Sequence, residues 1–152
     1  MLDTALLVLN ERARGSDERA ALDDAVRVLR HAYRVRIITP RTQHELESAV
    51  RESDEDLVIA AGGDGTVNAI VGALRPAATL GILPVGTAND FACELGVPRQ
   101  LREAAARLVS HQAAAPRVVD LLDVDGRPFC TVGGVGLVAR TTVAVLHMKE
   151  GR

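Results

Sequence analysis

Short, continuous apolar runs alternate with helically spaced apolar positions from residue 5 to residue 108. The runs predict strands that are covered on both faces, because a strand with one face in water would alternate apolar and polar positions. The helical stripes, in which apolar residues recur every three or four positions, predict amphipathic helices. The strands are expected at residues 5–9, 35–38, 57–61 and 80–83, and the helical stripes at 22–33, 46–50, 67–74 and 101–108.

Local signals mark where two of these helices begin. Ser16 and the two acidic residues after it favour a helix start before the first stripe. Thr42, followed three residues later by Glu45, forms a capping-box pattern before the second stripe. The strict alternation of strand and helix predicts a parallel sheet with crossover helices on its faces. We therefore expect residues 1–115 to form a three-layer α/β domain with a parallel sheet.

The pattern changes after Pro116. Two apolar stretches, at 118–124 and 127–132, flank Asp125-Gly126, a pair typical of two-residue hairpin turns. A glycine-rich bend and a β-branched run at 141–145 follow. These features predict the first strands of a β-rich second domain over residues 116–152. Because so few strands do not bury a face of their own, we expect this second domain to be incomplete, with its remaining part supplied from elsewhere.

Composition agrees with a folded domain and excludes several classes of function. Of the 152 residues, 47% are hydrophobic and 25% are charged, and the net charge is −2, as in an ordinary globular protein. Aromatic residues make up 2%, so the stacking platform and basic groove that nucleic-acid binding requires are not expected. No apolar run approaches the roughly 18 residues of a transmembrane helix, and the N-terminus lacks signal-peptide features, which predicts a cytoplasmic protein.

The residue types that usually bind transition metals are few. Cys93 and Cys130 are isolated in apolar settings, so we expect two reduced cysteines in the core. The four histidines show no metal-binding spacing. Any metal or acid–base chemistry must therefore rest on carboxylates.

The strand expected at 57–61 leads into a glycine-dense turn with the sequence GGDGTVN at 62–68. Ligands of open α/β sheets bind beyond the carboxyl ends of the strands, where this turn lies. Its glycines let backbone N–H groups approach a ligand closely, and the following helix contributes partial positive charge at its N-terminus. The turn is therefore a candidate anion site, and phosphate is the expected anion.

Asp64 stands in the middle of this candidate phosphate site, where its charge would repel the ligand. Two roles resolve the conflict: a Mg²⁺ ion lies between the carboxylate and the phosphate, or the carboxylate takes a proton from an attacking hydroxyl during phosphoryl transfer. The alternative is structural, with Asp64 capping the helix while the glycines turn the chain.

A second polar turn, with the sequence PVGTANDF at 84–91, follows the strand expected at 80–83. Thr87 and Asp90 have capping-box-like spacing, which predicts a helix that begins after Thr87 and leaves a purely structural role open. Both turns follow strands of one parallel sheet. We therefore expect them to converge on one crevice that offers hydroxyl, amide and acid groups.

Two longer segments, AAGGDGTVNAIVGAL at 60–74 and LGILPVGTANDFACELGVP at 80–98, resemble the catalytic domain of the diacylglycerol kinase family. The resemblance extends to VVDLLDVDGRPFCTVGGVG at 118–136 and is strongest to the soluble bacterial lipid kinases related to sphingosine kinases. NAD kinases and 6-phosphofructokinases share the superfamily fold and a similar GGDG loop, but GTANDFA is the lipid-kinase version. The resemblance implies an α/β nucleotide-binding domain followed by a β-rich domain.

The resemblance also implies which residues bind Mg·ATP. The phosphates would lie around the glycine turn, Thr87 and Asn89 would contact the nucleotide from the second turn, and Thr39 would lie at its edge. Asn10 matches the asparagine of the family's first loop, although Asn10-Glu11 replaces the usual Asn-Pro or Asn-Gly. The candidates are Asn10, Thr39, Gly62, Gly63, Gly65, Thr66, Val67, Asn68, Thr87 and Asn89 for the nucleotide, Asp64 for catalysis, and Asp64, Asp90 and Asp120 for Mg²⁺, held indirectly through water.

By the same resemblance, the chain would be the ATP-binding domain of a lipid kinase that moves the γ-phosphoryl group of Mg·ATP to a lipid hydroxyl, with diacylglycerol as the leading substrate. The family's β-rich domain supplies further metal ligands and the acid–base group, so this chain alone is expected to lack a complete catalytic apparatus. An NAD-kinase-like enzyme and a non-catalytic nucleotide-binding module are the alternatives. The expected partners are ATP, a lipid, a membrane surface contacted transiently, and a second chain at an open sheet edge.

Overall fold

Residues 3–10, 16–110 and 116–130 are described by the computed structural model of the chain. Four strands form the main sheet: β1 (Asp3–Leu9), β2 (Tyr33–Ile38), β3 (Leu57–Gly62) and β4 (Thr79–Pro84). Their order is β2-β1-β3-β4, and all three pairings are parallel. The four strands predicted from the apolar runs are confirmed, each one or two residues longer than expected.

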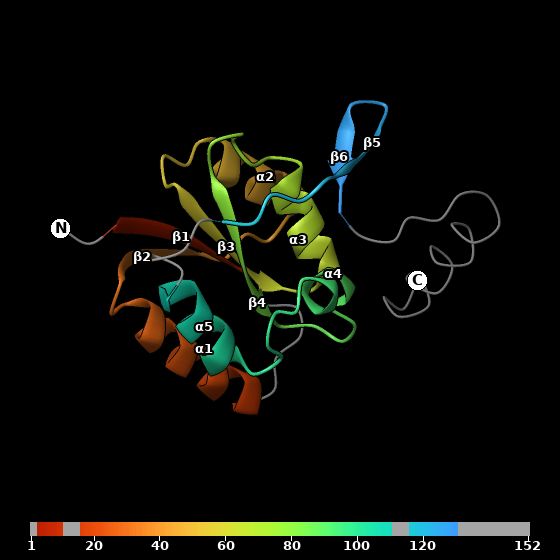
Figure 1. Cartoon of the computed structure of the whole chain (residues 1–152). Coiled ribbons are helices and arrows are strands. Elements are labelled where there is room, and N and C mark those ends of the chain that lie inside the picture. The colour runs from red at the N-terminus through yellow and green to blue at the C-terminus, as the bar shows by residue number, and fades with distance from the viewer. Residues whose placement is uncertain (1–2, 11–15, 111–115, 131–152) are drawn as a thin grey trace.

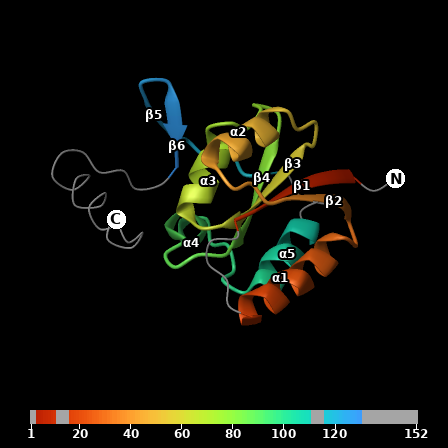
Figure 2. The ribbon, with the colours of Figure 1, turned by 180° about the vertical axis from the view of Figure 1, so that it is seen from behind.

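Helices cover both faces of this sheet and give the molecule three layers (Figures 1 and 2). On one face α1 (Ser16–Leu29) and α5 (Leu101–Ser110) lie side by side. On the other face lie α2 (Gln43–Arg51) and α3 (Asp64–Val71), and the short α4 (Asp90–Glu94) packs beside α3. The predicted three-layer α/β fold is confirmed.

Consecutive residues of the interior strand β1 enter two different cores. Leu7 of β1 packs in the core with α1 and α5, whereas Leu6 and Val8 pack in the core with α2 and α3. All three side chains are fully buried. The strand therefore needs apolar residues at consecutive positions, and each fully buried Leu contributes roughly 1.5–3 kcal/mol.

Tyr33 differs from its predicted place. The apolar stripe at 22–33 put Tyr33 on the first helix, but α1 ends at Leu29 and Tyr33 begins β2. Its ring still enters the core with α1 and α5, and its hydroxyl donates a hydrogen bond to Leu108 O at 3.1 Å. Because Tyr33 follows Leu29 by four residues and is buried on the same side, it imitates one further helical turn.

Local hydrogen bonds set the ends of α2 and α3. Thr42 Oγ1 accepts a hydrogen bond from the Glu45 N–H at 3.1 Å and caps α2, which confirms half of the predicted capping box. Glu45 Oε2 accepts from the Arg41 N–H at 2.8 Å instead of returning to Thr42. Helix α3 has Gly72 as its C-cap and so ends before its predicted stripe does. Glycine inside a helix costs about 1 kcal/mol relative to alanine, so a helix end is favoured there.

A separate two-stranded sheet follows, formed by β5 (Leu122–Val124) and β6 (Arg127–Phe129). Asp125 and Gly126 between them have φ values of 53° and 75°. These left-handed values are the ones that the tightest hairpin turn requires. Asp123 Oδ1 accepts a hydrogen bond from the Gly126 N–H at 2.9 Å and supports the turn.

The predictions for the C-terminal part of the chain are met in part. The hairpin is confirmed, but its strands are shorter than 118–124 and 127–132. The predicted β-branched strand at 141–145 lies outside the described residues. The division into domains 1–115 and 116–152 stays a prediction. Of the helices that the structure describes, none has the length and apolar character needed to cross a membrane.

Candidate functional site

The carboxyl ends of β1, β3 and β4 meet at one edge of the sheet and continue into loops that are bonded to one another. Asn10, which follows β1, donates its backbone N–H to Ala61 O at 3.1 Å. Val85, which follows β4, donates its N–H to Gly62 O, also at 3.1 Å. The loops after three neighbouring strands therefore form one continuous edge, in the place where open α/β sheets bind ligands.

The two glycine turns touch each other through their backbones. A Cβ atom on Gly86 would lie 2.7 Å from Gly63 Cα, so a side chain fits there only if the turns move apart. A Cβ atom on Gly62 would overlap the Thr66 side chain. Gly65 is different, because nothing lies within 4 Å of the place where its Cβ would stand. The first turn is thus packed closely against its neighbours and is open at Gly65.

Asp64 fastens the first turn to the helix after the second. Helix α3 is capped by Gly63, whose carbonyl oxygen accepts hydrogen bonds from the N–H groups of Thr66 and Val67. Asp64 Oδ1 accepts a hydrogen bond from the Phe91 N–H of α4 at 3.2 Å. The carboxylate therefore caps a neighbouring helix, which differs from the structural alternative in which it caps its own.

The second turn leads into a helix that begins later than predicted. Helix α4 starts at Asp90, and its N-cap Asn89 has φ 55° and ψ 45°, a left-handed conformation. The left-handed turn redirects the chain after Thr87, so the predicted capping-box start at Thr87 is wrong. Asn89 Nδ2 donates to Gly86 O at 2.7 Å, while its Oδ1 is buried and has no hydrogen-bond partner in the described part of the chain. A buried acceptor without a donor is unusual, and this one lies beside both glycine turns.

Asn10 and Thr39 lie at the same edge of the sheet, Asn10 in contact with the start of α3 and Thr39 two strands away from it. Asn10 Nδ2 donates to Thr66 Oγ1 at 3.0 Å, which joins the loop after β1 to the start of α3. Thr39 follows β2, and β1 separates β2 from β3 in the sheet. Thr39 is exposed and lies toward the outer end of the edge.

A contact that the sequence did not predict joins α3 to the hairpin. Cys130, the residue after β6, donates its N–H to Asn68 Oδ1 at 3.0 Å, and its Sγ lies 3.7 Å from the same oxygen. Burial, with a smaller contribution from the nearby charge of Asp64, raises the pKa of the Cys130 thiol to about 11. The one sequence signal for this contact is the four-residue spacing of Asp64 and Asn68, which places them on one helix face. Cys93 on α4 is exposed, so the prediction of two core cysteines is wrong for it.

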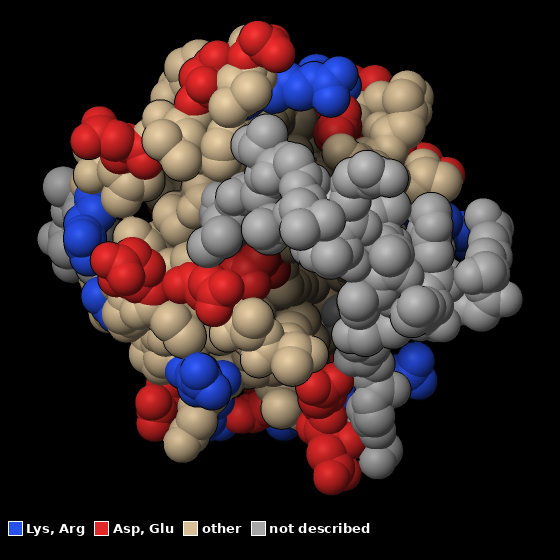
Figure 3. Space-filling model, turned by 90° about the vertical axis from the view of Figure 1, so that its right-hand side faces the viewer, with Lys and Arg blue, Asp and Glu red and all other residues tan. Residues whose placement is uncertain are grey.

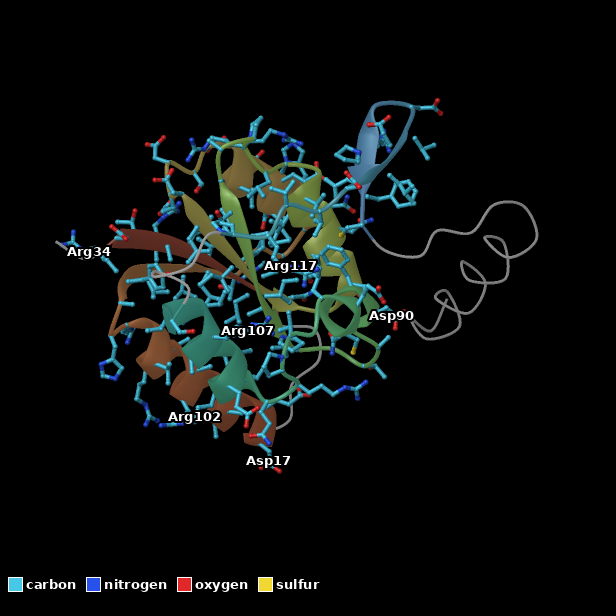
Figure 4. The ribbon with its side chains drawn as sticks, viewed as in Figure 1. Asp17, Arg34, Asp90, Arg102, Arg107 and Arg117 are labelled. Carbon is cyan, nitrogen blue, oxygen red and sulfur yellow. The ribbon has the colours of Figure 1, made fainter. Side chains whose placement is uncertain are left out.

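The three candidate metal-binding carboxylates are not gathered into a cage. Asp64 is partly buried, whereas Asp90 and Asp120 are exposed, and Asp90, the first residue of α4, lies at the surface (Figure 4). Within residues 3–10, 16–110 and 116–130, no three His, Cys, Asp or Glu side chains are grouped so that they could hold a metal ion. Figure 3 shows several acidic side chains beside one another on the side of the molecule that carries α4 and the hairpin. A cation on this side would therefore take part of its oxygen ligands from outside the described residues.

Comparison with known proteins gives one consistent family. The model of the family described as "Diacylglycerol kinase catalytic domain" matches residues 4–121. A diacylglycerol kinase of Bacillus subtilis (strain 168) is 45% identical over 102 residues, which are 65% of this chain and 32% of that protein. A protein of Pectobacterium atrosepticum named "Probable lipid kinase YegS-like" is 36% identical over 147 residues, which are 90% of this chain and 47% of that protein.

A solved structure has the same architecture. The crystal structure of a diacylglycerol kinase from Bacillus anthracis str. Sterne matches with a TM-score of 0.74 and 32% sequence identity, over 84% of this chain and 49% of that one. The chain thus spans about half, or less, of the length of these relatives. With the family model covering residues 4–121 and the fold in agreement, the chain belongs to the diacylglycerol kinase catalytic domain family.

Proposed function

We propose that this chain is the ATP-binding part of a lipid kinase that transfers the γ-phosphoryl group of Mg·ATP to a lipid hydroxyl, with diacylglycerol as the leading substrate. The observation that carries the proposal is the backbone contact between Gly63 and Gly86. The hydrogen bond from the Phe91 N–H to Asp64 Oδ1 also joins the two turns. The names of the relatives support the lipid class. Phosphoryl transfer requires mainly positioning and charge stabilisation from the protein, and two converging glycine turns are suited to both.

The turn at the start of α3 suits the phosphates of ATP. Gly65 leaves open space where its Cβ would stand, and the N-terminus of the eight-residue helix places N–H groups and partial positive charge beside it. The N–H groups of Thr66 and Val67 are already bonded to Gly63 O, and they close the turn. The amides that remain for phosphate are those of the first two helical residues, at positions 64 and 65.

The other nucleotide contacts are proposed to come from the loops around this turn. Asn89 Oδ1 is a buried acceptor that lacks a donor in the described residues, and a hydroxyl group, an amine or a metal-bound water of the ligand would supply one. Thr87 is exposed at the same edge, and Asn10 is held against Thr66. Thr39 would meet the end of a ligand that extends along the edge toward β2.

Mg²⁺ is proposed to be held by Asp64 together with the phosphates. In nucleotide sites Mg²⁺ usually keeps several waters and takes one or two carboxylates. It therefore does not need a closed cage of carboxylates and can be bound where they are dispersed. Asp64 Oδ1 is bonded to the Phe91 N–H, which leaves Oδ2 for the ion or its waters. Asp90 and Asp120 would act through water. When bound, the ion neutralises the charge that sets the carboxylate against the phosphates.

Asp64 is assigned to the metal rather than to proton abstraction. A general base must lie within hydrogen-bond reach of the hydroxyl that it deprotonates. One oxygen of Asp64 accepts the hydrogen bond from the Phe91 N–H of α4 and so stabilises the second turn. The group that takes the proton from the lipid is therefore proposed to lie outside the described residues, which bind and orient the nucleotide.

The lipid substrate also determines the expected location. We propose a cytoplasmic protein that contacts a membrane surface transiently to reach its lipid and that binds no nucleic acid. Within the described part of the chain β2 is an edge strand of the sheet, so pairing with a second chain there is compatible with the fold.

A transfer assay with two acceptors tests the proposed function. The full-length gene product is incubated with Mg·ATP labelled in the γ-phosphate and with either diacylglycerol in mixed micelles or NAD. We expect the label on diacylglycerol and none on NAD. Label on NAD alone would favour an NAD-kinase-like enzyme. Binding of Mg·ATP without transfer to either acceptor would favour a non-catalytic nucleotide-binding module.

A further inference from the structure

One face of α3 fastens two separate backbone segments through side-chain oxygens. Asp64 and Asn68 are four residues apart in this helix and so lie on the same face. Asp64 Oδ1 accepts from the Phe91 N–H at 3.2 Å, and Asn68 Oδ1 accepts from the Cys130 N–H at 3.0 Å. The first donor belongs to α4 and the second follows β6. One helical turn of α3 therefore connects the glycine turn, the helix after the second turn and the hairpin.

The Asn68 contact lies where the hairpin meets the α/β layers. Cys130 is half-buried and packs against the core that lies between the sheet and helices α2 and α3. Its thiol lies 3.7 Å from the same Asn68 oxygen that accepts from its N–H. By contrast, Leu122 and Val124 on the other hairpin strand are 64% and 55% exposed. The hairpin therefore contacts the α/β layers through β6 and Cys130, whereas Leu122 and Val124 of β5 are exposed.

We infer that Asn68 is a positioning residue, whose side-chain oxygen fixes the place of Cys130, the residue after β6, relative to the glycine turn. This is a different role from the nucleotide contact that the family resemblance implies for Asn68. Its consequence for phosphoryl transfer rests on the proposed function, because the end of the hairpin at Cys130 would then need a fixed place relative to the bound nucleotide. The contact with Cys130 does not depend on that function.

Thiol alkylation reports the contact directly, and Cys93 provides an internal reference. Cys93 is exposed while Cys130 is half-buried, so iodoacetamide should modify Cys93 first in the folded wild-type chain. Asn68→Ala removes the acceptor, and alkylation of Cys130 should become at least about fivefold faster, the factor that corresponds to a hydrogen bond of about 1 kcal/mol. Asn68→Asp keeps an acceptor oxygen in the same place and should leave Cys130 slow. Mass spectrometry follows the two cysteines separately.

Two alkylation results would overturn the inference. One is an unchanged Cys130 rate in Asn68→Ala. The other is a rise at Cys93 equal to that at Cys130, because it would indicate general loosening of the fold. Neither reaction contains ATP, so failure of the proposed function would leave this result standing.

Nucleotide binding then separates positioning from ligand contact. Calorimetry should give Asn68→Ala an affinity for Mg·ATP within about twofold of wild type. In the full-length gene product, the same variant should lower kcat and leave KM for ATP unchanged, and Asn68→Asp should restore kcat at least in part. A loss of Mg·ATP affinity above about tenfold, with Cys130 still slow, would make Asn68 a nucleotide ligand and contradict the inference.

Discussion

Gly86→Ala should force apart the two turns that form the candidate site. A Cβ atom at residue 86 would lie 2.7 Å from Gly63 Cα and 2.8 Å from Asn89 Oδ1. Neither neighbour can move easily, because Gly63 Cα is a backbone atom and the Asn89 side chain is held by its hydrogen bond to Gly86 O. Overpacking of this kind typically costs about 1–3 kcal/mol, and we expect a loss of unfolding free energy in that range.

Gly65→Ala is the matched control, with an effect of opposite sign on stability. Nothing lies within 4 Å of a Cβ atom at residue 65, which stands in the first turn of α3. Alanine should therefore fit and stabilise the chain by up to about 0.5–1 kcal/mol. The same methyl group would occupy the space proposed for the phosphates. Gly65→Ala should thus be at least as stable as wild type and bind Mg·ATP more weakly.

Urea unfolding followed by far-ultraviolet circular dichroism suits this chain, which has no Trp and one Tyr. With an m-value of about 2 kcal/mol per molar urea, a loss of about 2 kcal/mol lowers the unfolding midpoint by about 1 M. A wild-type midpoint for Gly86→Ala would refute the close contact of the two turns. Wild-type Mg·ATP affinity for Gly65→Ala would refute the place assigned to the phosphates.

Two further predictions concern stability away from the site. Arg36 donates two hydrogen bonds to Glu55, at 2.6 and 2.9 Å, and together with the Ser53 hydroxyl it lowers the pKa of Glu55 from 4.5 to about 2. A carboxyl with a lowered pKa stabilises the fold at pH values above its unfolded pKa. After allowance for the half-exposed Arg36, this contribution is about 1 kcal/mol. It should be lost as pH falls from 4.5 toward 2. Unfolding free energies measured from pH 7 to pH 3 should fall less steeply in Glu55→Gln than in wild type, and equal slopes would contradict the pairing. Thr42→Ala removes the cap of α2 and should cost about 1 kcal/mol at pH 7, whereas an unchanged midpoint would show that the Glu45 N–H finds another acceptor.

The strands were predictable because each of their positions is constrained. Leu6 and Leu7 face opposite cores, so the run of apolar residues reports burial on both faces, which helices impose on a parallel sheet. The convergence of the turns followed from the same topology. The close contact of Gly63 and Gly86 requires residues without side chains, so the glycines of both turns indicate it. The sequence does not say which of these glycines touch.

The contacts that fasten the site were not predictable in the same way. Asp64 bonds a backbone group 27 residues away, and Asn68 bonds one 62 residues away. Such bonds depend on where the packed layers bring the backbone, and no periodicity or short motif encodes them. The left-handed conformation of Asn89 was not predictable either, because asparagine tolerates this conformation but does not require it. For this reason the helix α4 begins later than predicted.

Calorimetric titration with Mg·ATP, comparing wild type with Asp64→Asn, tests the central claim most directly. Asparagine keeps an oxygen that can accept from the Phe91 N–H, so the turns stay fastened while the charge is removed. Asp56→Asn is the matched control, because Asp56 is a 91% exposed carboxylate just before β3, at the opposite edge of the sheet.

We expect wild type and Asp56→Asn to bind Mg·ATP alike, Asp64→Asn to bind at least about tenfold more weakly, and EDTA to abolish the binding. Equal affinity in Asp64→Asn, binding that persists in EDTA, or no binding by the folded wild-type chain would contradict a Mg·ATP site at the glycine turn.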